Sequence, residues 1–179
     1  MPERLYQLGF DENLKPTVPQ NVTPEGFAGL EFDKGEELGR FVGEIRERVC
    51  IKSPNEVAQY LLTKVYVPFE DFDQEEMWVL LLDSKLRITH EVMVYRGQVG
   101  QIYIREAELL KEAIRVNAPA PILSHCYPTG DPTPSPEDAR GIGLINEAAD
   151  LLGIELLDHI VVGKDSWVSL KERGLGFES

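Results

Sequence analysis

Three side chains that could bind a metal ion, His125, Tyr127 and Asp138, lie close together in the sequence. Imidazole and carboxylate groups are common zinc ligands, and a zinc site that activates water typically has three protein ligands and one open position. Here Tyr127 stands where a second histidine would complete the set. A phenol titrates near pH 10 and must lose its proton to bind metal, whereas a neutral imidazole need not. We therefore expect weak zinc binding or none.

The spacing of these residues is compatible with one shared site. In an extended segment, side chains two residues apart point to the same face, so His125 and Tyr127 can face one metal ion while Cys126 points away. The proline-rich loop that follows can fold back and bring Asp138, in the first turn of the next predicted helix, beside His125. That arrangement would supply a third ligand.

Hydrolysis at such a site would also need a general base, a role that glutamate usually fills in zinc hydrolases. Glu75 and Glu76, at the start of a predicted buried strand, are the candidates. Each part of the pattern also has a structural explanation. The sequence 135–138, Ser-Pro-Glu-Asp, is a helix cap with proline at the first helical position, and the acidic run over 70–76 is typical of a solvated loop. The joint spacing is what favours a site.

The predicted elements place these residues at one end of a sheet. Apolar residues at helical spacing and capping signals predict helices over 34–50, from 53 to before Pro68, over 105–116 and from 135 to before Gly153. Apolar and β-branched runs predict strands over 77–82, 87–95, 120–124, 156–162 and 167–170. The result is an α/β fold with a mixed sheet flanked by helices. His90 and His159 fall inside predicted strands, and we expect them to be core or hydrogen-bonded residues.

Composition narrows the class of protein. With 31 acidic and 18 basic residues, the net charge of −13 disfavours nucleic acid as a partner, because binding to phosphate relies on Lys and Arg. Two cysteines indicate no disulfide framework, and no apolar run approaches the roughly 20 residues of a membrane helix. The start of the chain lacks the pattern of a signal peptide. We expect a cytoplasmic protein without membrane contact.

Several motifs carry a resemblance to a known family. His125, Pro128 and the Ser-x-x-Asp at 135–138 are similar to the JAMM motif of JAB/MPN metalloproteases, which has His-x-His, seven residues and then Ser-x-x-Asp. The run over 125–135, His-Cys-Tyr-Pro-Thr-Gly-Asp-Pro-Thr-Pro-Ser, resembles the RadC branch more closely. The tail over 156–174 also resembles the RadC ending. The resemblance covers residues 53 to 175, so we divide the chain into an N-terminal extension, 1–52, and a RadC-like JAB/MPN domain, 53–179.

The resemblance implies a cytidine-deaminase-like, three-layer α/β fold and zinc-dependent peptidase or isopeptidase chemistry. Carried over by position, the resemblance implies that His125 and Asp138 are zinc ligands. It also implies that Glu75 is the general base and that Ser135 donates a hydrogen bond to the oxyanion. Glu76 is the alternative base. Tyr127 occupies the position of the second zinc-ligating histidine and departs from it.

We therefore expect a RadC-like JAB/MPN protein with a degenerate zinc site, noncatalytic or weakly metal-binding, with a protein or peptide partner. The alternative is an active zinc metallopeptidase or isopeptidase. A DNA-repair role is the least supported, because residues 1–52 lack the helix-hairpin-helix pattern that RadC proteins usually carry. We expect that extension to be an irregular arm, up to about residue 32, followed by an amphipathic helix.

Overall fold

The computed structural model describes residues 9–10, 16–17, 41–45, 48–97 and 105–177. The chain divides into two units, residues 1–37 and 38–179. In the first unit, β1 (Gly9–Phe10) pairs antiparallel with β2 (Pro16–Thr17). The rest of the arm predicted over residues 1 to 32 lies outside the described residues. The second unit contains all the candidate site residues.

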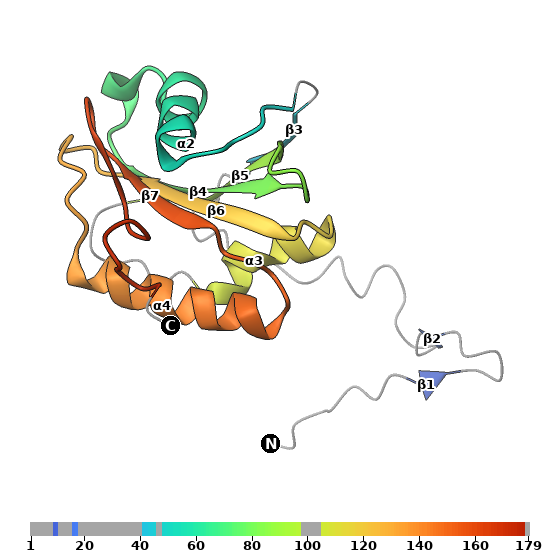
Figure 1. Cartoon of the computed structure of the whole chain (residues 1–179). Helices are drawn as coiled ribbons and strands as arrows, with labels where there is room; N and C mark the ends of the chain where they lie inside the picture. Colours follow the sequence, from blue (N-terminus) through green and yellow to red (C-terminus); the bar gives the residue numbers. More distant parts are fainter. Residues whose placement is uncertain (1–8, 11–15, 18–40, 46–47, 98–104, 178–179) are drawn as a thin grey trace, which may run out of the picture. The chain divides into compact units, whose positions relative to one another are not determined.

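The second unit is built around a six-stranded mixed sheet of order β3-β5-β4-β6-β7-β8 (Figure 1). Its strands are β3 (Phe41–Glu44), β4 (Glu75–Leu82), β5 (Ile88–Gly97), β6 (Ala120–Cys126), β7 (Asp158–Val162) and β8 (Trp167–Ser169). Strands β6 and β7 run parallel, and the other neighbouring pairs are antiparallel. The five strands predicted from residue 77 onward are confirmed.

Helices cover both faces of the sheet, as Figure 1 shows for α2 on one side and for α3 and α4 on the other. They are α2 (Pro54–Tyr60), α3 (Glu106–Arg115) and α4 (Pro136–Leu151). Along β4, Val79 and Leu81 pack in the core that includes α3 and α4, whereas Leu80 and Leu82 pack in the core that includes α2. Burial on both faces explains why β4 is continuously apolar. The predicted three-layer α/β architecture is confirmed.

Two of the helices begin as the sequence predicts. The Ser53 hydroxyl accepts a hydrogen bond from the backbone N–H of Glu56 at 3.3 Å, and Pro54 occupies the first helical position of α2. Helix α2 then continues into a wider helical turn, Leu61–Val65, before Pro68. Ser135 caps α4 in the same way. No helix in the described part of the chain is long and apolar enough to cross a membrane.

The helix predicted over 34–50 is wrong at its centre. Phe41–Glu44 forms β3, which pairs antiparallel with β5, while residues 34–40 and 46–47 lie outside the described residues. Gly43 weakens a helix here, since glycine costs about 1 kcal/mol relative to alanine in a helix interior. Strand β5 offers backbone groups that need hydrogen-bond partners. The sheet edge therefore overrides the helical spacing of the apolar residues.

Candidate functional site

Strand β6 carries His125 to the candidate site. It extends two residues further than the predicted 120–124, so that His125 lies within the strand, paired with Met77 of β4 and Val161 of β7. The His125 and Tyr127 rings are in contact, with centroids 4.8 Å apart and an interplanar angle of 82°. Cys126 packs instead in the core beneath α2, where burial raises the pKa of its thiol to about 12. The predicted division of faces is therefore observed.

The loop after β6 returns Asp138 to this place, where its side chain forms a hydrogen-bonded cluster. Atom Oδ2 of Asp138 accepts from the Tyr127 hydroxyl at 2.6 Å, the Ser135 backbone N–H at 2.6 Å and the Ser135 hydroxyl at 2.8 Å. The Asp138 N–H in turn donates to the Ser135 hydroxyl at 3.1 Å, which completes a capping box at the start of α4. We call these three residues the Tyr127–Asp138–Ser135 clasp. The clasp leaves Oδ1 of Asp138 facing Nε2 of His125 at 3.9 Å.

The clasp also fixes protonation states. Burial, together with the hydrogen bond to Asp138 and its negative charge, raises the pKa of Tyr127 well above its ordinary value. Burial acts to raise the pKa of Asp138, but His125 and the donors from Tyr127 and Ser135 outweigh it, so that this pKa is below its ordinary value. At neutral pH the phenol is therefore protonated and the carboxylate ionised. A protonated phenol is a hydrogen-bond donor, not an anionic metal ligand.

The two candidate bases lie on opposite faces of β4. Met77 pairs with His125 and Glu76 pairs with Cys126, so strand alternation places Glu75 on the face of His125. Glu76 is engaged on the other face, where it accepts from the Trp78 indole at 2.7 Å and pairs with Arg96 at 3.2 Å. Burial and the charge of Asp138 raise the pKa of Glu75 above its ordinary value. The geometry favours Glu75 over Glu76 as the carboxylate of the site.

Three polar side-chain atoms of the described residues are buried without a hydrogen-bond partner; one is His159 Nδ1, and the other two, His125 Nε2 and Glu75 Oε1, belong to predicted site residues. Burial lowers the pKa of His125 despite the opposing effect of Asp138, so the ring is neutral at neutral pH. Unpartnered buried polar atoms are uncommon and carry a desolvation cost. These two atoms therefore mark a place where a ligand, a water molecule or a metal ion would be stabilised.

The donor set fits a zinc ion only in part. Two ligands of a tetrahedral zinc at about 2.0–2.2 Å lie roughly 3.4 Å apart, so a small shift would let His125 Nε2 and Asp138 Oδ1, now 3.9 Å apart, share an ion. The Tyr127 hydroxyl is committed to Asp138. Across the described part of the chain, no three His, Cys, Asp or Glu side chains are grouped as a metal ion would require. Two ligands do not make a catalytic zinc site.

A second histidine, His159, belongs to this site, and its partner could not be predicted from the sequence. Its Nε2 lies 2.6 Å from Nδ1 of His125, and the two rings have centroids 4.8 Å apart at 72°. The prediction that His159 is a core or hydrogen-bonded residue is correct. The contact arises because β7 is the parallel neighbour of β6, and that neighbour relation cannot be inferred from local sequence patterns.

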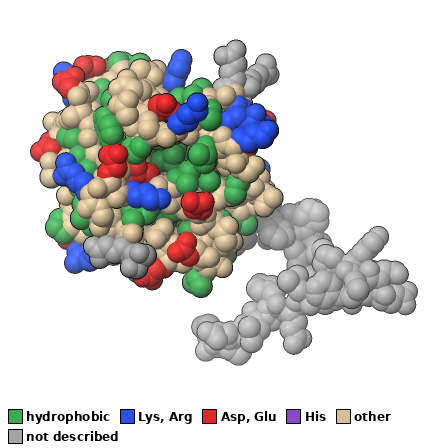
Figure 2. Space-filling view, viewed as in Figure 1, with side chains coloured by type: hydrophobic (Ala, Val, Ile, Leu, Met, Phe, Trp, Pro, Cys, Tyr) green, Lys and Arg blue, Asp and Glu red, His purple; other side chains and the backbone are tan. Residues whose placement is uncertain are grey.

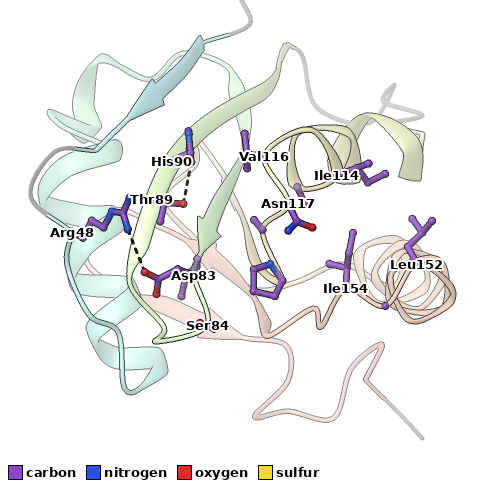
Figure 3. Close-up of a pocket in the computed structure, with 15 residues that line it drawn as sticks. Arg48, Asp83, Ser84, Thr89, His90, Ile114, Val116, Asn117, Leu152 and Ile154 are labelled. Carbon is purple, nitrogen blue, oxygen red and sulfur yellow. Dashed lines mark hydrogen bonds and ion pairs between the residues drawn. The ribbon is translucent and has the colours of Figure 1, made fainter. Parts of the chain in front are cut away.

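A concave pocket of about 640 Å³ lies at the opposite end of β4 and β6 (Figure 3). Arg48 and Asp83 form an ion pair at 3.6 Å in its wall, and His90 contacts the Thr89 hydroxyl at 3.0 Å. Ile114 and other apolar residues from the ends of α3 and α4 line the other side, as Figure 3 shows. The pocket includes none of the predicted site residues, so it is distinct from the site at His125.

Most of the chain is similar in sequence to known proteins. A family model described as RadC-like JAB domain matches residues 51–175. The chain is 42% identical over 151 residues to a UPF0758 protein of Chloroflexus aggregans, covering 84% of this chain and 62% of that protein. It is 40% identical over 174 residues to a UPF0758 protein of Roseiflexus castenholzii, covering 97% and 71%, respectively. The chain thus spans about three fifths of the length of the Chloroflexus relative.

Proposed function

Because the chain belongs to the RadC-like JAB domain family, we propose that it is a member whose zinc site has been replaced by the Tyr127–Asp138–Ser135 clasp. In this proposal the domain does not catalyse hydrolysis and binds zinc weakly or not at all. Its role is to keep the fold as a module that binds a protein or peptide partner in the cytoplasm. The hydrogen bond from the Tyr127 hydroxyl to Asp138 Oδ2 carries the proposal.

That hydrogen bond opposes metal binding in two ways. The phenol would have to lose its proton although its pKa is raised, and Asp138 would lose a donor that stabilises its charge. The Ser135 hydroxyl donates its proton to Asp138 at 2.8 Å, so that proton is not available to a reacting oxyanion. Tyr127 in the third ligand position, the Asp138 carboxylate and the Ser135 hydroxyl are thus hydrogen-bonded to one another and not available to a metal ion or substrate.

Surface charge supports a partner other than nucleic acid. On the face shown in Figure 2, basic and acidic side chains are interspersed among apolar ones. The net charge of the chain is −13. Binding to a phosphate backbone relies on clustered Lys and Arg. A DNA-repair role is therefore the weakest of the candidate functions, and salt-sensitive DNA binding near physiological ionic strength is the observation that would revive it.

Metal analysis of Tyr127→His tests the proposal. The wild-type chain and the variant are purified without chelator, and bound zinc is measured per chain. We expect about one zinc per chain in Tyr127→His and far less in the wild type, because imidazole replaces a protonated phenol. At a free zinc concentration of about 100 times Kd, the variant should gain roughly 2.7 kcal/mol of unfolding free energy.

Tyr127→Phe is the matched control. It breaks the same hydrogen bond to Asp138 without adding a ligand, so we expect it to remain as zinc-poor as the wild type. Stoichiometric zinc in the wild type, bound as tightly as in Tyr127→His, would contradict the proposal.

A second candidate function, an active zinc-dependent peptidase or isopeptidase, is favoured by one observation. His125 Nε2 and Glu75 Oε1 are both buried, without a partner among the described residues, on the face where such a site would lie. This function requires Tyr127 to bind as a phenolate in the third ligand position. It predicts one zinc per wild-type chain and the loss of that zinc in Tyr127→Phe, the opposite of the result expected above.

A further inference from the structure

Two buried histidines face each other from neighbouring parallel strands. His125 in β6 and His159 in β7 are 5% and 1% exposed, and their facing atoms, Nδ1 and Nε2, are 2.6 Å apart. Leu123 pairs with His159 in the strand register, which puts the His159 side chain on the same face as His125. At this distance one hydrogen atom lies between the two nitrogens, because two N–H groups would collide.

The backbone around His159 is held firmly by its neighbour Asp158. The Asp158 carboxylate accepts from the His159 backbone N–H at 2.7 Å, the Ser169 hydroxyl at 2.7 Å and the Lys171 N–H at 3.2 Å. The side chain of Asp158 thus ties β7 to the end of β8. The His159 side chain is itself buried, and close packing limits the freedom of its ring to turn away from His125.

Two arrangements of two protons are possible in the neutral pair. In the first, His159 Nε2–H donates to His125 Nδ1, and the second proton is on His125 Nε2. In the second, His125 Nδ1–H donates to His159 Nε2, and the second proton is on His159 Nδ1. Both contain the same number of protons, so they differ only in tautomer.

The surroundings of the pair distinguish the two arrangements. His125 Nε2 faces the ionised Asp138 at 3.9 Å, so a proton is stabilised there and a lone pair is repelled. His159 Nδ1 is buried with no hydrogen-bond partner among the described residues. Each arrangement leaves one of these two nitrogens as an N–H without a hydrogen-bond partner among the described residues, so that cost does not distinguish them. The negative charge of Asp138 therefore favours the first arrangement.

We propose that His159 is a positioning residue for His125: its Nε2–H donates to His125 Nδ1 and keeps the His125 proton on Nε2, directed at Asp138. The assignment concerns the metal-free protein and holds whether or not the site takes zinc. A metal ion or other electrophilic ligand needs a lone pair on His125 Nε2, so its binding would require both rings to change to the other tautomer together.

Nitrogen NMR of the histidine rings tests the assignment. The full chain is labelled with ¹⁵N-histidine, treated with EDTA and studied by long-range ¹H–¹⁵N correlation at neutral pH. The chain has three histidines, so His90→Gln identifies the third ring. We expect both His125 and His159 to be protonated at Nε2, with the His159 Nε2–H shifted downfield and protected from exchange. A proton on His125 Nδ1, or averaged nitrogen shifts in either ring, would overturn the proposal.

Two variants separate positioning from simple packing. In His159→Gln the amide N–H lies near the former Nε2, so we expect His125 to keep the Nε2–H tautomer. In His159→Leu the donor to Nδ1 is lost and only the charge of Asp138 still favours Nε2–H, so the two nitrogen shifts of His125 should move toward the average of its tautomers. An unchanged His125 pattern in His159→Leu would refute the proposal. If His159→Leu does not fold, the wild-type spectrum and His159→Gln still decide it, and neither depends on the zinc result for Tyr127→His.

Discussion

The two ends of the sheet hold their carboxylates in different ways. At the end near the pocket, Asp83 accepts hydrogen bonds from the Arg87 guanidinium at 2.6 and 2.9 Å, which lower its pKa to about 2. At the other end, Asp138 is held by hydroxyl and amide donors from Tyr127 and Ser135, and an imidazole faces it. One carboxylate is paired with cations at the surface, and the other is part of a half-buried network.

The difference helps to decide which end of the sheet is the better candidate for a functional site. An arginine pair at a turn is sufficient as a structural feature, and exposed pairs of this kind contribute little to stability. The end near Asp138 carries buried atoms without partners at His125 Nε2 and Glu75 Oε1, which cost stability. Perturbed and unpartnered buried groups cluster at functional sites. This pattern favours the end near Asp138 over the end near Asp83 as the candidate functional site.

The largest effect is expected for Asp138→Asn. Asparagine would leave donors of the clasp without their charged acceptor, so we expect a loss of about 1.5–3 kcal/mol in the free energy of unfolding, measured in urea. The matched change at the other end, Asp83→Asn, should cost less, because its partners Arg87 and Arg48 can be hydrated. A loss for Asp83→Asn equal to or larger than that for Asp138→Asn would break the comparison.

A smaller effect is expected for Tyr127→Phe, which removes one hydrogen bond and should cost about 0.5–1.5 kcal/mol in unfolding free energy at pH 7. The pKa of Asp138 is lowered in the folded protein, so its contribution to stability is present above the unfolded pKa, about 3.9, and is lost as pH falls through the folded pKa. Without the tyrosine donor the folded pKa should rise toward the unfolded one. Urea unfolding from pH 7 to pH 2 measures both effects, and identical profiles would show that the hydroxyl does not bind Asp138 in solution.

The smallest effect, and the one of opposite sign, is expected for Glu75→Gln. The pKa of Glu75 is raised in the folded protein, so its ionisation reduces stability as pH rises from the unfolded pKa, about 4.3, through the folded pKa. The neutral amide avoids that cost, and we expect a small gain in unfolding free energy at pH 7 that disappears below pH about 4. Glu76→Gln serves as the contrast, since loss of its bonds to Trp78 and Arg96 should destabilise the protein. A loss of stability in Glu75→Gln at pH 7 would contradict the inference that the charge of the half-buried Glu75 lowers stability.

Local patterns predicted most elements of the fold. The continuous apolar run of β4 and the capping signals at Ser53 and Ser135 give the correct type of element because each depends on nearby residues. The helix predicted over 34–50 fails at Phe41–Glu44, because pairing with β5 depends on residues far away in the sequence. The spacing of apolar residues within 34–50 contains no information about the edge of β5, which forms only when the chain folds.

In the candidate site, too, some features could be predicted from local sequence and others depend on long-range packing. Sequence by itself determined the residue types, including a tyrosine where a histidine would complete a zinc site, and the alternation that turns Cys126 away. Tertiary structure alone decided that the Tyr127 hydroxyl is bound to Asp138 and that His159 contacts His125. It also places Glu75, which the sequence already favoured over Glu76, on the face of His125. The reason is that residue identity fixes what a group can donate or accept. Which partner it meets depends on strand order and loop return, which long-range packing sets.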